Sequence, residues 1–171
     1  MARVLIDRRT IHKRVRELGI AISRDYAGEE LLVVAILKGA AIFVADLVRQ
    51  IAVPLSVEFM EVCSYDGTES TSRVAIIKDL QAPLAGKNIL LVEDIVDTGA
   101  TLSSLITHLR ARNPKTLRVC ALLTKPDRRL IHVDLDYLGF SVPNEFVVGY
   151  GLDYRGLYRN LPDLRILNSQ M

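Results

Sequence analysis

The sequence lacks the features that mark several large classes of protein. Its two cysteines, Cys63 and Cys120, are too few for a disulfide framework, and neither has a nearby Cys or His to complete a zinc site. The longest apolar run, residues 31–37, ends at Lys38, far short of the ~20 residues that span a bilayer. The N-terminus has no hydrophobic signal segment. The charges nearly cancel, with 22 basic and 20 acidic residues, so no excess of positive charge favours duplex DNA as a partner.

What is present is typical of a globular chain. Of the 171 residues, 50% are hydrophobic and 25% are charged, which excludes a disordered or low-complexity protein. A domain of this length buries about 70% of the surface that its unfolded chain exposes. No repeat or Ser/Pro-rich linker divides the chain. We therefore expect one soluble, cytoplasmic domain over residues 1–171 that does not bind a membrane.

The hydrophobic pattern alternates between strand and helix. Continuous apolar runs at residues 31–37, 89–92 and 117–123 predict strands buried on both faces, and residues 55–63 begin with strand-like alternation. Apolar residues at helical spacing predict three helices, the first with Thr10 as a candidate N-cap. Their inward positions are Ile11, Val15, Leu18 and Ile22; Ala41, Val44, Val48 and Ile51; and Leu102, Leu105, Ile106 and Leu109. This order predicts an α/β fold, with a central parallel sheet and helices on both faces.

The texture of the sequence changes after Lys125. Three short candidate strands, residues 134–139, 145–148 and 164–167, are separated by prolines and glycines. We interpret residues from about 125 to 171, together with some N-terminal residues, as a small subdomain, called the hood below. The core would then comprise residues from about 25 to 124.

The most informative segment follows the strand predicted at residues 89–92. Glu93, Asp94 and Asp97 place three carboxylates within five residues, a costly arrangement at the end of a buried strand unless a positive group faces them. A turn of small residues then opens the next helix: Thr98, Gly99, Ala100 and Thr101. Backbone N–H groups at such a turn favour a phosphate.

These acids and this turn make sense together when a cation or sugar hydroxyls lie between them. In an open parallel sheet, ligands bind beyond the carboxyl ends of the strands. The pattern therefore indicates a sugar phosphate with Mg²⁺. The alternative from residue types alone is that Glu93 and Asp94 are solvated loop acids and that Asp97 only caps the helix.

Three further polar segments follow predicted strands, each with a structural alternative. Lys38 and Gly39 end the first strand, where a lysine often reaches for water. Residues 64–73 form a polar loop, either an exposed hairpin tip or an active-site lid. The third comprises Lys125, after the last parallel strand, and the run from Phe146 to Arg159. Within that run, Phe146 and Val147 alone would be core residues, and Asp153 and Arg159 alone would be a surface ion pair.

Several common chemistries have no support. The sequence contains no G-x-x-x-x-G-K-[ST] phosphate loop and no G-x-S-x-G nucleophile elbow. The three histidines lie in separate predicted elements without metal-ligand spacing: His12, His108 and His132.

Residues 92–102 resemble the 5-phosphoribosyl-1-pyrophosphate (PRPP) signature of the type I phosphoribosyltransferases. The Glu-Asp pair, followed three residues later by Asp-Thr-Gly, is similar to the hypoxanthine-guanine branch of that family. The segments Phe-Val-Val-Gly at residues 146–149 and Leu-Asp-Tyr at residues 152–154 add specificity for 6-oxopurines. The resemblance covers nearly the whole chain and implies the type I phosphoribosyltransferase fold.

The resemblance implies roles for PRPP-binding residues. Glu93 and Asp94 would hold the ribose hydroxyls and Mg²⁺. The 5′-phosphate would lie against Asp97, Thr98, Gly99, Ala100 and Thr101. Ala100 stands where some relatives carry a lysine, so only its main chain would contribute. Pyrophosphate would meet Lys38, Gly39, Ser64, Tyr65 and Arg159, with a cis peptide between Leu37 and Lys38 and a lid beginning at Ser64 and Tyr65.

Purine binding and catalysis are implied in the same way. Lys125 would donate to the purine O6, Phe146 would stack on the base, and the Val147 backbone would contact the base edge. Asp153 would reach a second Mg²⁺, with its backbone near purine position 2. Asp97 would act as the general base that takes the proton from N7 while N9 attacks the ribose C1. The expected products are IMP or GMP and pyrophosphate, and relatives form homodimers or homotetramers.

Two alternative functions stay open at this point. A regulator of the same fold would bind nucleic acid and use PRPP or a nucleotide as effector. The near-neutral charge and the joint presence of Asp97, Lys125 and Arg159 argue against it. The basic residues around Lys115 and Arg128 are interpreted as solvated surface. Phe146 and Lys125 argue against a pyrimidine substrate, whereas a preference for xanthine is compatible with the sequence.

Overall fold

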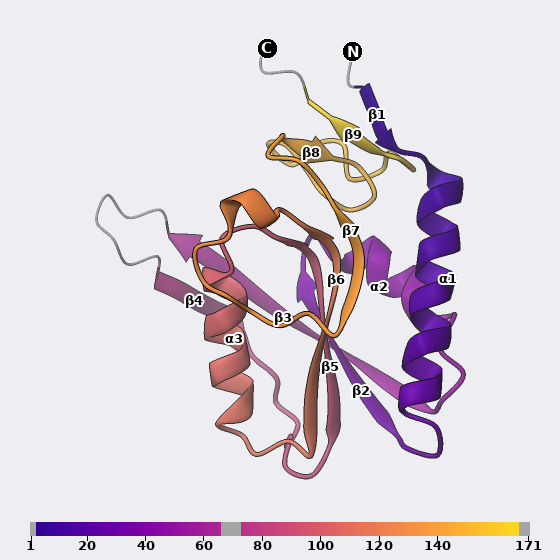
Figure 1. The fold of residues 1–171 in the computed structure, drawn as a ribbon. Helices are drawn as coiled ribbons and strands as arrows, with labels where there is room; N and C mark the ends of the chain where they lie inside the picture. Colours follow the sequence, from indigo (N-terminus) through magenta and orange to yellow (C-terminus); the bar gives the residue numbers. More distant parts are fainter. Residues whose placement is uncertain (1–2, 66–72, 168–171) are drawn as a thin grey trace.

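The computed structural model describes residues 3–65 and 73–167, which form two β-sheets with helices packed beside the larger one (Figure 1). The larger sheet has six strands in the order β4-β3-β2-β5-β6-β7. Their bounds are β2 Leu31–Leu37, β3 Leu55–Tyr65, β4 Arg73–Lys78, β5 Asn88–Val96, β6 Thr116–Thr124 and β7 Tyr137–Ser141. All neighbouring pairs are parallel except β3 with β4. The predicted parallel α/β sheet is therefore confirmed.

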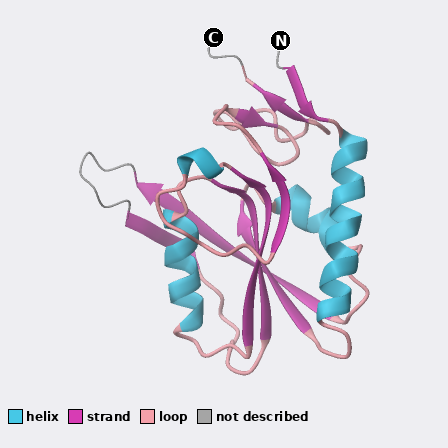
Figure 2. Cartoon of the chain, viewed as in Figure 1, coloured by secondary structure: helices cyan, strands magenta, loops and turns pink. Residues whose placement is uncertain are grey.

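Helices cover both faces of this sheet (Figure 2). Helices α1 (Arg8–Asp25) and α2 (Ala41–Val48) share one hydrophobic cluster with the sheet, and α3 (Ala100–Arg110) shares a second cluster on the opposite face. The predicted inward residues of α1, Ile11, Val15, Leu18 and Ile22, are all buried. None of the helices in the described part of the chain has the length and apolar character needed to cross a membrane.

The first helix begins earlier than its apolar pattern suggests. The N-cap is Asp7, whose carboxylate accepts hydrogen bonds from the backbone N–H groups of Arg9 and Thr10 at 2.8 and 3.1 Å. Thr10 lies within the first turn and donates its hydroxyl to Asp7 Oδ2. The prediction of Thr10 as the cap was wrong, because Asp7 satisfies the free N–H groups one turn ahead of the first buried residue.

The smaller sheet has the order β1-β9-β8, with β1 Arg3–Ile6, β8 Val147–Val148 and β9 Leu164–Ile166. It joins the N-terminal residues to the C-terminal segment, and the division of the chain into a core and a hood stays a prediction. The expected boundary differs in one respect. Strand β7 pairs with β6 in the larger sheet, so residues 137–141 extend the core and are not part of the hood.

The carboxyl ends of β2, β5 and β6 point toward the hood sheet (Figure 1). These strand ends and the segments that follow them carry several of the candidate residues, among them Lys38, Glu93, Asp94 and Lys125. The parallel register places them side by side, since β5 pairs with both β2 and β6. The fold therefore gathers residues near positions 38, 94 and 125 at one edge.

Candidate functional site

Two adjacent carboxylates occupy the end of β5. Glu93 is 7% exposed, and burial together with the neighbouring Asp94 raises the pKa of Glu93 well above its ordinary value. Burial also raises the pKa of Asp94, while the positive charge of Arg159 acts in the opposite direction. A cation would offset the cost of charging this pair. Glu93 is buried and Asp94 partly buried, and both lie within strand β5, so neither is a solvated loop acid.

The acids suit Mg²⁺ by their chemistry and number. Mg²⁺ is commonly held by one or two carboxylates, with water and substrate phosphate oxygens completing its shell. In the described residues no three His, Cys, Asp or Glu side chains converge on one point. The Glu93–Asp94 pair therefore fits a magnesium ion that arrives with a phosphorylated substrate better than a metal held by protein alone.

The turn after β5 is hydrogen-bonded to the segment that follows β6. Gly99 is the N-cap of α3, with a φ of 87°, a left-handed conformation that favours glycine. The Thr98 carbonyl accepts hydrogen bonds from the N–H groups of Leu130 and Ile131, both at 3.0 Å, and a Cβ at Gly99 would collide with the Ile131 carbonyl oxygen. The first amides of α3 are thus fixed around a point that attracts anions.

Two arginines after β6 lie against this turn. The Arg128 Nε is 2.7 Å from Asp97 Oδ1, an ion pair without hydrogen-bond alignment. The Arg129 guanidinium contacts Thr124 Oγ1, and its buried Nη1 has no hydrogen-bond partner. The interpretation of the Arg128 region as solvated surface was wrong, since both arginines lie against this turn. Their position directly after Lys125, at the end of a buried strand, was the available signal.

The loop after β2 approaches Asp94 closely. The Leu37–Lys38 peptide bond is cis, as the resemblance implied. Gly39 lies so near the Asp94 carboxylate that a Cβ would overlap Oδ2. The backbone of residue 39 is therefore in contact with the acidic end of β5, which unites the first two candidate segments in one site.

The segment after β8 adds a third wall. Arg159 pairs with Asp153, with 2.6 Å between Nη2 and Oδ1, and donates through Nη1 to the Gly151 carbonyl at 2.6 Å. Both side chains are about two-thirds buried, so they are not a surface ion pair. A Cβ at Gly151 would overlap the Gly39 carbonyl oxygen. This segment is thus in direct contact with the loop after β2.

The remaining predicted residues fall into three groups. Phe146 is 49% exposed and meets Tyr154 edge-on, with ring centroids 5.5 Å apart, so Phe146 is not a core residue. Val147 is buried in β8 and Lys125 is only 8% exposed. The Lys125 ammonium has no hydrogen-bond or ion-pair partner among the described side chains. The side chains of Ser64 and Tyr65 lie outside the described residues, as does the proposed lid over residues 66–72.

Comparison with known proteins agrees with this architecture. Residues 5–155 match the family model described as phosphoribosyl transferase domain. A hypoxanthine-guanine phosphoribosyltransferase of Mycobacterium avium is 47% identical, covering 98% of this chain and 86% of the relative. One of Staphylococcus aureus is 46% identical, covering 98% and 94%.

Solved structures give the same result. A crystal structure of a hypoxanthine-guanine phosphoribosyltransferase from Bacillus anthracis superposes with a TM-score of 0.92 at 42% identity, covering 96% of this chain and 97% of that one. A hypoxanthine phosphoribosyltransferase from Staphylococcus aureus superposes equally well, with a TM-score of 0.92 at 47% identity and coverage of 96% and 90%. The chain therefore belongs to the phosphoribosyl transferase domain family.

Proposed function

We propose that this protein transfers the 5-phosphoribosyl group from PRPP to N9 of hypoxanthine or guanine, which yields IMP or GMP and pyrophosphate in purine salvage. One observation carries the proposal. The buried Glu93 and its partly buried neighbour Asp94 lie just before the anion-attracting turn at the start of α3. The full-length similarity to hypoxanthine-guanine phosphoribosyltransferases supports the same activity.

PRPP would lie along the edge formed by the three strand ends. Residues 98–101 would hold the 5′-phosphate through their backbone N–H groups, helped by the positive end of α3. Glu93 and Asp94 would hold the ribose hydroxyls. Lys38, Gly39 and Arg159 would hold pyrophosphate, together with Ser64 and Tyr65 at the end of β3. All of these groups would belong to one phosphoribosyltransferase domain, residues 1–171.

Glu93 and Asp94 would hold one Mg²⁺ and Asp153 would reach a second; when bound, these ions would supply positive charge to the pyrophosphate group. Lys38 and Arg159 neutralise the negative charge that develops on this leaving group, an effect that usually dominates such catalysis. Asp97 accepts the proton from purine N7 as N9 bonds to C1 of the ribose. A positioned general base of this kind contributes about 10²–10⁴-fold.

Purine selection would depend on four residues. Lys125 donates a hydrogen bond to the purine O6, which an amino group at that position cannot accept. Phe146 offers an exposed ring on which the base can stack. The backbone of Val147 contacts the base edge, and that of Asp153 lies near position 2. Lys125 is only 8% exposed, and because its ammonium has no acceptor among the described side chains, the purine O6 would supply one, which supports this arrangement.

A substrate panel tests the proposed activity. The purified protein is assayed with PRPP and Mg²⁺ against hypoxanthine, guanine, xanthine, adenine and uracil. We expect turnover of hypoxanthine, guanine or both, and none of adenine or uracil. Turnover of xanthine alone would reassign the base. No turnover of any base, combined with tight binding of PRPP, would favour a regulatory role.

A homo-oligomeric state and a cytoplasmic location stay predictions of the family resemblance.

A further inference from the structure

Tyr150 occupies an unusual stretch of backbone beside the proposed pyrophosphate site. Gly149, Tyr150 and Gly151 have consecutive positive φ angles of 98°, 48° and 102°. A bulky side chain rarely adopts this conformation, and it persists where surrounding contacts enforce it. The Tyr150 side chain is only 3% exposed. The contacts of the Tyr150 side chain therefore help to hold the turn in this conformation.

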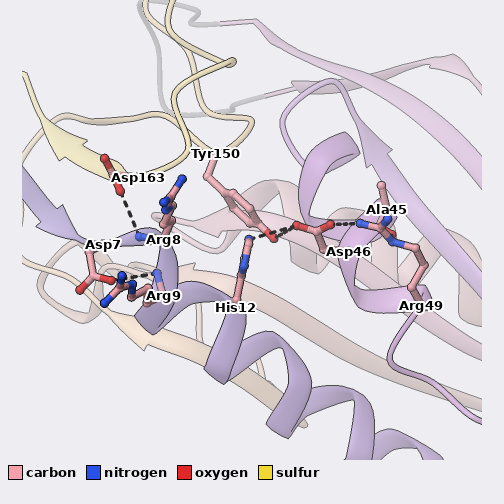
Figure 3. Close-up of polar contacts among 9 residues, drawn as sticks. All are labelled: Asp7, Arg8, Arg9, His12, Ala45, Asp46, Arg49, Tyr150 and Asp163. Atoms are coloured by element: carbon pink, nitrogen blue, oxygen red, sulfur yellow. Dashed lines mark hydrogen bonds and ion pairs between the residues drawn. The ribbon is translucent and has the colours of Figure 1, made fainter.

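The phenol of Tyr150 connects this turn to helix α2. It donates a hydrogen bond of 2.7 Å to Asp46 Oδ2, across 104 residues of sequence (Figure 3). Burial, followed by this hydrogen bond, raises the pKa of Tyr150, so the phenol stays protonated and able to donate. The other Asp46 oxygen is paired with Arg49, and His12 Nε2 lies 4.0 Å from Oδ2. The Asp46 carboxylate is thus paired with Arg49 at the end of α2 and lies near His12 of α1.

The two partners stand next to opposite sides of the proposed site. Helix α2 begins at Ala41, two residues after Gly39. On the other side, Gly151 follows Tyr150 directly and accepts the hydrogen bond from Arg159, which in turn pairs with Asp153. The backbones of Gly39 and Gly151 touch. The Tyr150–Asp46 hydrogen bond therefore joins the two backbone segments that would grip one pyrophosphate group.

We propose that Tyr150 and Asp46 are positioning residues that hold the Asp153–Arg159 segment against Lys38 and Gly39, so that both sides bind pyrophosphate together. The inference rests on the pyrophosphate role proposed above for those segments. Neither Tyr150 nor Asp46 contacts substrate in this account. They set the distance between the two segments that contact pyrophosphate, and small errors in such a distance strongly reduce binding and rate.

The chain offers a matched control for removing the phenol. Tyr137, at the amino end of β7, is 6% exposed and donates to Asp25 Oδ2 at 2.9 Å. Tyr150→Phe and Tyr137→Phe each remove one partly buried phenol–carboxylate hydrogen bond and keep the ring; Tyr137→Phe also removes the hydrogen bond that the phenol accepts from Arg118 Nη1 at 2.8 Å. We expect Tyr150→Phe to raise the KM for PRPP, and for pyrophosphate in the reverse reaction, by about three- to tenfold, in line with the net value of one such bond. The KM for hypoxanthine stays unchanged. Tyr137→Phe changes none of these values.

Asp46 variants provide the second test. Asp46→Asn retains an oxygen that can accept from the phenol, so it should keep the pyrophosphate KM near wild type. Asp46→Ala should match Tyr150→Phe, and combining Asp46→Ala with Tyr150→Phe should add little, as expected for two partners of one interaction. Asp46→Ala also serves as the test where Tyr150→Phe does not fold.

Arg159→Gln separates this inference from the proposed site. A raised pyrophosphate KM in Arg159→Gln, together with Tyr150→Phe and Asp46→Ala values equal to those of Tyr137→Phe, would overturn the positioning role alone. An unchanged pyrophosphate KM in Arg159→Gln would overturn the site assignment on which the role depends. Additive effects of Tyr150→Phe and Asp46→Ala would also contradict the inference.

Discussion

At the end of β5, Glu93 and Asp94 occupy positions where burial makes a negative charge costly. Glu93 is buried beside Asp94, and its raised pKa reflects the cost of charging a carboxylate there. Asp97, four residues further on, is partly exposed and paired with Arg128. The chain thus separates the buried Glu93 and its neighbour Asp94 from a more accessible carboxylate, Asp97, that could exchange a proton with substrate.

Replacing Glu93 with glutamine should stabilise the ligand-free protein while abolishing most activity. Because folding raises the pKa of Glu93, the folded state loses stability as the pH rises from the ordinary value of 4.5 through the raised native pKa. The neutral amide avoids this loss. The gain in unfolding free energy should therefore be small near pH 4 and grow with pH, to on the order of 1–2 kcal/mol.

Denaturant unfolding of wild type and Glu93→Gln between pH 4 and 8 measures this gain. The control is Glu145→Gln, because Glu145 is an exposed acid. A constant difference between wild type and Glu93→Gln over the whole range would show that Glu93 is not strained by burial.

Replacing Asp97 with asparagine tests the proposed general base. The amide keeps the shape of the side chain but cannot accept the N7 proton, so kcat should fall by about 10²–10⁴-fold. IMP affinity, measured by calorimetry, should be largely unchanged. Asp134→Asn, in an exposed segment away from the strand ends, serves as the control. Unchanged turnover in Asp97→Asn would remove Asp97 from this role.

At the scale of elements, the long periodic segments could be predicted from the sequence. The buried strands β2, β5 and β6 and helices α1 to α3 produce continuous or helical apolar patterns, because burial repeats along the element. Strand β4 pairs at the edge of the sheet through a polar loop, and β7 finds its partner through a long-range contact. Neither pairing leaves a local pattern.

The same division applies to the candidate site. Residues 93–101 are contiguous, so their chemistry could be read directly from the sequence. Arg128, Arg129 and the hydrogen bond between Tyr150 and Asp46 depend on tertiary contacts between distant segments. Such contacts have no spacing rule along the chain, which is why they were missed.

The cap of α1 gives an element-scale prediction. Asp7→Ala should lower the thermal midpoint by a few degrees, because two backbone N–H groups lose their acceptor. These hydrogen bonds also lower the pKa of Asp7, so its contribution is present above the ordinary value of 3.8 and is lost as the pH falls through the native pKa.

Thermal unfolding followed by circular dichroism at pH 7 and pH 3 measures this contribution. The effect of Asp7→Ala should be smaller at the lower pH. Thr10→Val removes only the side-chain hydrogen bond to Asp7 and should cost less. An equal loss in Thr10→Val and Asp7→Ala at pH 7 would return the capping role to Thr10.

At the scale of the whole molecule, the proposed site is shared between the larger sheet and the segment that follows β8. The acids come from β5 and the turn from the segment that follows it. The loop after β2 adds the contact at Gly39, and the segment after β8 adds the Asp153–Arg159 pair. The hood is also joined to α1 through Asp163, whose Oδ1 accepts from the Arg8 N–H at 3.0 Å (Figure 3). Substrate bound between these parts would bridge them.

A crystal structure of the protein with Mg²⁺ and PRPP tests the central assignment most directly. We expect the 5′-phosphate against the backbone amides of residues 98–101, the ribose hydroxyls beside Glu93 and Asp94, and the pyrophosphate between Gly39 and Arg159. A complex in which the phosphate lies away from the start of α3, with both acids free of ribose and metal, would contradict the account.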